Sequence, residues 1–325
     1  MAHSDSSSSR RLALKARLLG QADDRGARGP VLGDGSTGSV LLALAPAAPE
    51  RLALLPLEGP GMLAELHEAY FQAGSELVET ATFQASAQGL ESWAAEGLAL
   101  DGRLIHDASE LAYRVNLAAA RLARQAADAA EAASGQWRYV AGSMGPGDRS
   151  PSLGFSNWAG LKASYLPQAR GLADGGCDLA IVETCQDPLQ VKAALAALAD
   201  PEGGLGLPAV VSATVDARGH LLVGTSLAAL VAILAPYEPL ALGLNCSGGP
   251  AELEPSLAEL AASSPLPLSF MPNAGIPAMA GGRTVWPLQA QAFASLVAAM
   301  AGRHGVALLG GCCGTGPAHI AALAA

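Results

Sequence analysis

The chain is poor in the residues that nucleic-acid partners and membranes require. Its 325 residues include only 19 Lys or Arg against 29 Asp or Glu, a formal net charge of −10, and they form no basic patch. Because Lys and Arg drive phosphate binding, this balance argues against nucleic acid as a partner. No run of about 18 apolar residues lacks a Gly or Pro interruption, and the polar, Ser-rich residues 1–11 contain no signal-peptide core. We therefore expect no nucleic-acid partner and no membrane association.

Aromatic residues are also scarce, at 4%, whereas half of the chain is apolar and 38 residues are Gly. This composition is typical of a packed α/β enzyme rather than of a disordered or fibrous chain. There are only five cysteines, an odd number without the spacing of a disulfide scaffold. We therefore expect a reducing, cytoplasmic environment, with Cys177 and Cys185 in ordinary packing roles.

From Val31 onward, short apolar runs alternate with longer helical patterns, which indicates a parallel sheet with crossover helices. Eight strands are predicted, at residues 31–33, 76–79, 138–141, 178–182, 209–213, 241–244, 268–271 and 306–309. Helices are predicted at residues 62–73, 107–133, 158–173, 188–199, 226–235, 251–262, 287–302 and 317–324. A basic amphipathic segment at residues 10–19 precedes the first strand.

Nearly every predicted strand runs into a polar or glycine-rich loop at its carboxyl end. A (β/α)8 barrel gathers all eight such loops around one site, whereas a doubly wound open sheet gathers only those near its switch point. The sequence therefore predicts an α/β protein with a single (β/α)8 TIM barrel at residues 30–325. Residues 1–29 are predicted to be a short N-terminal extension, a Ser-rich tail followed by a helix and a loop.

The segment Gly310-Gly311-Cys312-Cys313-Gly314 places two thiols side by side in a glycine-rich turn. Adjacent side chains of a regular strand point to opposite faces, so directing both thiols at one ion requires an irregular turn, which glycine permits. Cys246, in another turn-rich segment, is the natural third ligand. Three thiolates leave one zinc position open, as in catalytic sites. The alternatives are a vicinal disulfide or buried small residues, and His319 is expected to pack in a helix rather than to bind the ion.

Six motifs follow predicted strands, and together they resemble the homocysteine S-methyltransferase family of zinc-dependent barrels from about Leu32 to the end of the chain. The sequence is most similar to the homocysteine-binding module of cobalamin-dependent methionine synthase. It departs from that module at Ser36-Thr37 and Ala81, where Ala-Met and Asn are usual. The motifs are Asp34-Gly35-x-x-Gly38, Glu79-Thr80-x-Thr82-Phe83, Gly142-Ser143-x-Gly145-Pro146, residues 178–184, Gly243-x-Asn245-Cys246 and Gly310-Gly311-Cys312-Cys313-Gly314-Thr315.

The resemblance implies an enzyme that activates homocysteine as a thiolate and methylates it to methionine. Cys246, Cys312 and Cys313 would hold Zn²⁺ and thereby be the catalytic residues. Asp34 and Glu183 would bind the substrate ammonium. Amides around Gly35 and the Ser143 hydroxyl would bind the carboxylate, and Asn245 is assigned to the same pocket, where it orients the metal turn. Without the resemblance, Asp34 and Glu183 are ordinary loop caps and Ser143 is a turn hydroxyl.

The methyl donor is the least determined part of the prediction. No folate or cobalamin module follows in this sequence, and the Asp-x-His-x-x-Gly corrinoid motif is missing, since Asp216 and His220 are too far apart to form it. We therefore expect methylcobalamin on a separate corrinoid protein. The alternatives are S-methylmethionine, a non-catalytic zinc barrel that docks a corrinoid protein, or betaine held by an aromatic cage of Trp93, Trp158 and Trp286.

Overall fold

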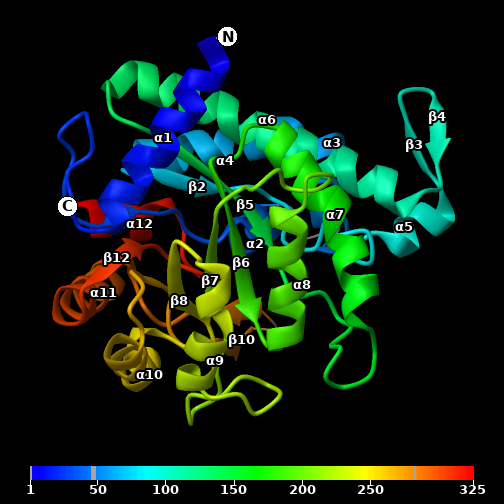
Figure 1. Cartoon of the computed structure of the whole chain (residues 1–325). Coiled ribbons are helices and arrows are strands. Elements are labelled where there is room, and N and C mark those ends of the chain that lie inside the picture. The colour runs from blue at the N-terminus through cyan, green and yellow to red at the C-terminus, as the bar shows by residue number, and fades with distance from the viewer. Residues whose placement is uncertain (1, 45–48, 282) are drawn as a thin grey trace.

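The computed structural model of the chain describes residues 2–44, 49–281 and 283–325, in which eight parallel strands curl into a nearly closed barrel surrounded by helices (Figure 1). The (β/α)8 fold and all eight predicted strands are confirmed. Four of the strands continue further toward the carboxyl end than predicted, and three of these extensions carry polar side chains to the rim. In sheet order the strands are β1 (Val31–Leu32), β12 (Val306–Leu309), β9 (Leu268–Pro272), β8 (Ala241–Cys246), β7 (Ala209–Ala213), β6 (Leu179–Cys185), β5 (Tyr139–Met144) and β2 (Leu77–Glu79).

The barrel is closed between β1 and β2, the two strands at the ends of the sheet order. Individual hydrogen bonds join them rather than a regular ladder. The Glu76 amide donates to the Leu32 carbonyl over 2.7 Å, and the Leu32 amide donates to Glu76 Oε2 over 3.0 Å. The Ser75 hydroxyl donates to the Gly33 carbonyl. These contacts bring the loops after β1 and β2 to the same rim as the other six.

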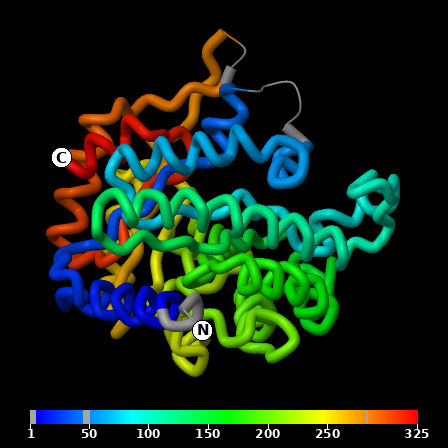
Figure 2. The backbone as a smooth tube through the Cα atoms, turned by 90° about the horizontal axis from the view of Figure 1, so that it is seen from above, coloured from blue at the N-terminus to red at the C-terminus, as the bar shows by residue number. Residues whose placement is uncertain are grey.

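Eight helices follow the eight barrel strands and cover the outside of the barrel (Figure 2). Four of them begin at a side-chain cap, Asp107, Asn157, Asp187 or Ser226, which accepts a hydrogen bond from a first-turn amide. The eight helices are α4 (Pro60–Gln72), α6 (Ala108–Ser134), α7 (Trp158–Asp174), α8 (Pro188–Ala199), α9 (Leu227–Leu234), α10 (Pro250–Ser263), α11 (Ala290–His304) and α12 (Pro317–Ala324).

The barrel also carries shorter helices and strands that the sequence pattern did not predict. One hairpin, β3 with β4, projects away from the barrel (Figure 1), and another, β10 with β11, lies in the loop after β9. Because that hairpin precedes it, α11 begins at Ala290 rather than at the predicted residue 287. The remaining short elements are α2 (Thr37–Leu44), η1 (Pro49–Leu54), α3 (Leu55–Glu58), α5 (Glu91–Glu96), η2 (Ala235–Tyr237), β3 (Leu98–Leu100), β4 (Arg103–Ile105), β10 (Ala278–Ala280) and β11 (Arg283–Val285).

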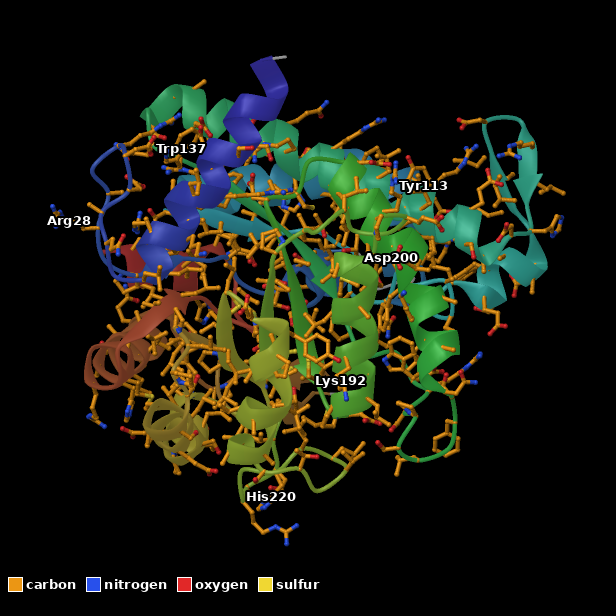
Figure 3. The ribbon with its side chains drawn as sticks, viewed as in Figure 1. Arg28, Tyr113, Trp137, Lys192, Asp200 and His220 are labelled. Carbon is orange, nitrogen blue, oxygen red and sulfur yellow. The ribbon has the colours of Figure 1, made fainter. Side chains whose placement is uncertain are left out.

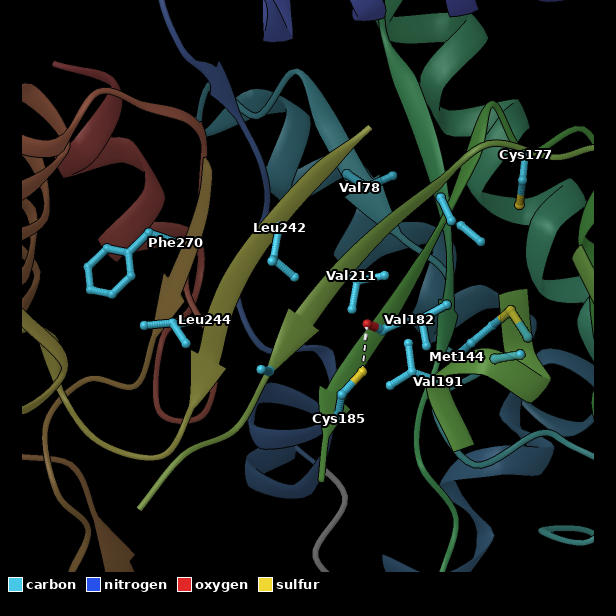
Figure 4. Close-up of a cluster of buried hydrophobic side chains, with 14 of the residues drawn as sticks. Val78, Met144, Cys177, Val182, Cys185, Val191, Val211, Leu242, Leu244 and Phe270 are labelled. Atoms are coloured by element: carbon cyan, nitrogen blue, oxygen red, sulfur yellow. Dashed lines mark hydrogen bonds between the residues drawn. The ribbon is translucent and has the colours of Figure 1, made fainter. Parts of the chain in front are cut away.

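Strand side chains alternate between two buried layers, as the period of two requires. Val78, Val182, Val211 and Leu242 pack in the layer that also contains side chains of the surrounding helices (Figure 4). Leu77, Tyr139, Leu179, Ile181 and Leu308 belong to the second layer, which fills the barrel interior. Every second residue of β5, β6 and β8 faces the barrel interior. At the carboxyl ends of these strands the interior-facing residues are Ser143, Glu183 and Asn245. The rim of the interior is therefore polar.

Helix α1 (Ala2–Leu18) lies across the end of the barrel at which the strands begin (Figure 1). It extends further toward the N-terminus than the predicted segment at residues 10–19. Leu14 and Leu18 are buried in the interior layer, and Arg17 forms a salt bridge with Glu76. In the part of the chain described here, no helix has both the length and the hydropathy that a membrane crossing needs.

Candidate active site

Three cysteines from β8 and from the loop after β12 meet at the carboxyl end of the barrel. The Sγ atom of Cys246 lies 3.4 Å from that of Cys312 and 3.6 Å from that of Cys313, and all three sulfurs lie within 4.8 Å of one another. All three are free, partly exposed thiols, so the structure shows neither a vicinal disulfide nor buried small residues. Among the described residues they form the only group of three potential metal ligands.

The turn that carries Cys246 has an unusual backbone. Cys246 and Ser247 both have a left-handed conformation, with φ of 56° and 59°, which costs a non-glycine residue on the order of 1 kcal/mol. The Ser247 hydroxyl compensates by accepting a hydrogen bond from the Val215 amide over 2.9 Å. This strained turn directs the thiol toward the loop after β12 instead of along the strand.

The second cysteine turn is held to the loop after β9 on both sides. The Cys312 amide donates to the Pro272 carbonyl over 2.8 Å, and the Cys313 carbonyl accepts from the Ala274 amide over 2.9 Å. Gly314 has φ of 80°, and a Cβ atom there would lie 2.1 Å from the Trp286 ring, so only glycine fits. These contacts fix two adjacent thiols on the same side of the chain.

The three thiols share their protons unequally. Hydrogen bonds from Cys246 and Cys312 lower the pKa of Cys313 to about 3. A hydrogen bond with Cys312 lowers the pKa of Cys246, but a hydrogen bond with Cys313 and burial outweigh it and raise that pKa to about 12. Hydrogen bonds with both neighbours raise the pKa of Cys312 well above its usual value. Two further protons must therefore leave before all three sulfurs are thiolates, a loss that a divalent cation favours.

Three carboxylates, Asp34, Glu79 and Glu183, converge beside the thiols. Asp34 is 1% exposed, and its Oδ2 accepts a hydrogen bond from the Glu79 amide over 2.9 Å. Glu183 accepts from the Ser143 hydroxyl at one oxygen and from Asn245 Nδ2, over 3.2 Å, at the other. Asn245 Nδ2 also lies 3.9 Å from Cys312 Sγ. Asn245 therefore connects the carboxylates with the thiols.

These carboxylates carry more negative charge than the surrounding residues balance. Burial raises the pKa of Asp34, Glu79 and Glu183, and repulsion from Glu183 raises the pKa of the other two further. In the described ranges, none of the three forms a salt bridge with an Arg, Lys or His side chain. The cluster is therefore suited to a ligand that brings its own positive charge.

All the predicted site residues lie at this rim. However, two of the groups that were expected to donate hydrogen bonds to the substrate carboxylate already donate to other residues. The Ser143 hydroxyl is used by Glu183, and the Ser36 amide, next to Gly35, donates to Thr315 Oγ1 over 3.2 Å. Gly35 itself is closely packed, since a Cβ atom there would lie 2.7 Å from Thr315 Oγ1. The loop after β1 is thus tied to the cysteine turn.

Residues predicted to lie outside the site do so. Cys177 and Cys185 are buried in the packed layer around the barrel, where the Cys185 thiol donates to the Val182 carbonyl over 3.1 Å (Figure 4). His319 packs edge-on against Phe293 and bonds through Nε2 with the Leu288 carbonyl over 3.1 Å. None of these residues belongs to the group of three potential metal ligands found among the described residues.

Two neighbouring residues were not predicted as part of the site. Glu79 is the last residue of β2 and stands in a recognised motif, so its position at a strand end was the available signal. Trp286 was considered only as part of an aromatic cage for betaine, and nothing in the sequence indicated its contact with Gly314, which joins loops that are distant along the chain. Trp93, by contrast, packs in a separate core beneath the Arg51 guanidinium, 4.9 Å from its ring. The three tryptophans therefore do not form one cage.

A cavity of about 550 Å³ opens beside the Cys246 turn, between the loops after β6 and β7. Its wall is joined to that turn by the Val215 amide, which donates to Ser247 Oγ, and by Thr214 Oγ1, which donates to the Asn245 carbonyl over 3.3 Å. His220 lines it and lies at the same end of the molecule as the other strand-end loops (Figure 3).

The fold and the site define a class of protein, a (β/α)8 barrel with three cysteines at the carboxyl ends of its strands that could together hold a metal ion. The family model for homocysteine S-methyltransferase matches residues 31–325, and the chain belongs to this family.

Relatives and solved structures agree with this assignment. The methionine synthases of Mycobacterium leprae and Mycobacterium tuberculosis are 37% and 35% identical to this chain over 268 residues, which is 82% of its length. The chain spans only 21% of the length of each of them. The homocysteine methyltransferase MmuM from Escherichia coli, in its metallated form, superposes with a TM-score of 0.71 and 29% identity. That match covers 91% of this chain and 95% of the MmuM chain.

Proposed function

We propose that the protein is a zinc-dependent homocysteine S-methyltransferase, which forms methionine by transferring a methyl group to the substrate sulfur. The observation that carries the proposal is a cluster of three thiols beside a cluster of three carboxylates, with the Asn245 amide in contact with Cys312 of the first and Glu183 of the second. Homocysteine has a thiol at one end and an ammonium group at the other, so it matches both halves of this arrangement. The similarity to methionine synthases and to MmuM supports the same substrate.

Cys246, Cys312 and Cys313 fit a zinc ion, because their sulfurs already lie within 4.8 Å of one another. Both turns that carry them are also held to neighbouring loops by backbone hydrogen bonds. When bound, zinc supplies a fourth position for the substrate sulfur and favours the loss of its proton. The chain's own part is to keep this position open and to hold Cys312 in place through Asn245.

The carboxylates supply the other half of substrate recognition. Asp34 and Glu183 are the proposed acceptors for the homocysteine ammonium group, and the geometry adds Glu79 as a third. Their mutual repulsion decreases when a cation binds among them. The transfer itself forms one S–C bond and breaks one bond between the methyl carbon and the donor, whose electron pair stays with the donor.

For the donor we propose a methylcorrinoid held outside residues 1–325, since these residues contain no corrinoid-ligand motif. The resemblance of the strand-end motifs to the homocysteine-binding module of cobalamin-dependent methionine synthase supports this choice. Betaine is disfavoured, because Trp93 lies in another core and cannot join Trp158 and Trp286 in an aromatic cage.

Metal analysis combined with homocysteine titration tests the site. The wild type should contain one zinc per chain, whereas C246A, C312A and C313A should each lose most of it, because two thiolates bind zinc poorly. C177A, a cysteine buried elsewhere, is the matched control and should keep the metal. In the cobalt-substituted wild type, homocysteine should change the visible absorption spectrum. An unchanged spectrum would indicate a closed, structural site and a docking role.

A donor comparison tests the reaction. Methionine formation is measured with free methylcobalamin, S-methylmethionine and betaine in parallel. Turnover with methylcobalamin supports the proposal. If methionine forms with S-methylmethionine or betaine but not with methylcobalamin, the corrinoid proposal is wrong and that small molecule is the methyl donor.

A further inference from the structure

The loop between β9 and α11, residues 273–288, is attached to both metal-binding turns. At its start, the Asn273 amide donates to the Gly248 carbonyl over 3.0 Å, two residues after Cys246. Close to this point the chains touch, since a Cβ atom on Gly249 would lie 2.7 Å from Gly275 Cα. At its end, Trp286 rests on Gly314, one residue after Cys313. The loop therefore connects the Cys246 turn with the Cys312-Cys313 turn.

The end of this loop is held firmly. The Leu288 amide donates to the Ala274 carbonyl over 3.0 Å, which joins the two ends of the loop to each other. The Leu288 carbonyl bonds with His319 Nε2 over 3.1 Å, and His319 Nδ1 accepts from the Gly316 amide over 3.3 Å. Trp286, two residues before Leu288, is consequently fixed relative to the thiols.

Between these attachments the start of the loop and its hairpin β10–β11 expose large apolar side chains. Ile276 is 57% exposed, Met279 71% and Val285 41%. Trp286, which follows Val285, is half-buried and belongs to none of the buried core clusters. Core packing thus does not account for a tryptophan here, in a chain with only four of them. Its position next to Cys313 does.

We propose that Trp286 contacts the methyl donor and, with the apolar hairpin before it, determines how the donor approaches the homocysteine sulfur. This inference rests on the proposed methyltransferase function. A rigid aromatic ring provides a large apolar contact area with little loss of side-chain entropy, which suits it to a planar corrin ring or to a cationic methyl group. The hairpin extends that apolar surface outward from the metal turns.

The test compares two alkylations of homocysteine on the zinc-loaded chain of residues 1–325, one by methylcobalamin and one by methyl iodide. Methyl iodide is too small to need a guiding wall. W286A should lower kcat/KM for methylcobalamin about tenfold, with W286F in between, and leave the methyl iodide rate within about twofold of wild type. Zinc content and homocysteine affinity should stay at wild-type values. Y237A is the matched control, because Tyr237 is an exposed aromatic residue at the opposite end of the barrel.

Two results would overturn the inference: zinc loss in W286A, which would show a purely structural role, or equal effects on both alkylations, including no effect on either. If only S-methylmethionine or betaine turns over in the wild type, that donor replaces methylcobalamin in the same comparison. Failure of the proposed function has a different pattern, since the wild type itself then transfers no methyl group from any of the three donors and Trp286 has no donor to contact.

Discussion

At the scale of single residues, the site combines two groups whose charges the chain leaves unbalanced. Three thiols become ligands only when their protons leave, and three carboxylates lie together with no salt bridge to a cationic side chain in the part of the chain that the structure describes. Asn245 contacts both groups, with its amide nitrogen 3.2 Å from Glu183 and 3.9 Å from Cys312. The proposed substrate, an amino acid with a thiol and an ammonium group, would relieve both imbalances at once.

Glu183→Gln keeps the size of the side chain but removes one negative charge. Homocysteine should bind roughly tenfold more weakly, because a hydrogen bond with a charged partner becomes a neutral one. The zinc content should not change. Calorimetric titration measures the affinity, and E202Q, at an exposed position after α8, is the control. An unchanged affinity in E183Q would remove Glu183 from the ammonium site.

Glu79→Gln should increase stability in a pH-dependent way. Burial and repulsion from Glu183 and Asp34 raise the pKa of Glu79 above its unfolded value of 4.5, so the folded state binds more protons and loses stability as pH rises above that value. Without this charge, the free energy of unfolding at pH 8 should increase by on the order of 1 kcal/mol. Urea unfolding at pH 8 and pH 4.5 measures it, and a gain that did not shrink at the lower pH would contradict the explanation.

At the scale of elements, the loop between β5 and α7 is held by one side chain from another element. Asp187, the cap of α8, accepts from the Leu189 amide over 3.0 Å and from the Ser150 hydroxyl over 2.6 Å. It also accepts from the amide and the hydroxyl of Ser152. Burial raises the pKa of Asp187, but these hydrogen bonds outweigh it and leave the pKa lower than usual. The cap of one helix thereby orders the loop before another.

Asp187→Ala should therefore destabilise the protein by about 1–2 kcal/mol and release this loop. Arg149 lies in the loop, so trypsin should cleave there faster in the variant than in the wild type. D187N, which keeps an acceptor for the cap, should fall between them. The stabilisation is present above the unfolded pKa of about 3.9 and is lost as pH falls through the lowered folded pKa. Equal cleavage rates in D187A and the wild type would show that the loop is held by other contacts.

At the scale of the whole molecule, α1 stabilises the end of the barrel opposite the site. The Arg17 guanidinium, whose side chain is 2% exposed, binds both carboxylate oxygens of Glu76, over 2.8 and 3.0 Å. Glu76 Oε2 in turn accepts a hydrogen bond from the Leu32 amide. The Arg17–Glu76 ion pair therefore lies where β1 and β2 close the barrel. The helix outside the barrel therefore contributes to closing it.

Arg17→Ala should lower the free energy of unfolding by about 3–5 kcal/mol, because Glu76 loses its partner at the seam. Arg28, which projects from the surface (Figure 3), is the matched control, and R28A should change stability by less than about 0.5 kcal/mol. Denaturant unfolding measures both. Zinc binding should persist in R17A, since the thiols lie at the other end. Equal stabilities of R17A and R28A would mean that the sheet closes without this pair.

The sequence by itself determined the eight strands, their order along the chain and the three thiols. Apolar periodicity and glycine-rich turns act over a few neighbouring residues, so they are visible in a linear chain. β7, β12, α8 and α12 have the predicted bounds for this reason. Family motifs placed Asp34, Ser143, Glu183 and Asn245 at strand ends, where the structure brings them together.

Only the tertiary structure decided which of these groups touch. The third carboxylate, Glu79, the link from Asn245 to Cys312, and the contact of Trp286 with Gly314 all join residues from different strands or loops. The closure by Arg17 and Glu76 likewise spans 59 residues. Such contacts depend on how the barrel curves and where its loops meet, and no local pattern of residues encodes that geometry.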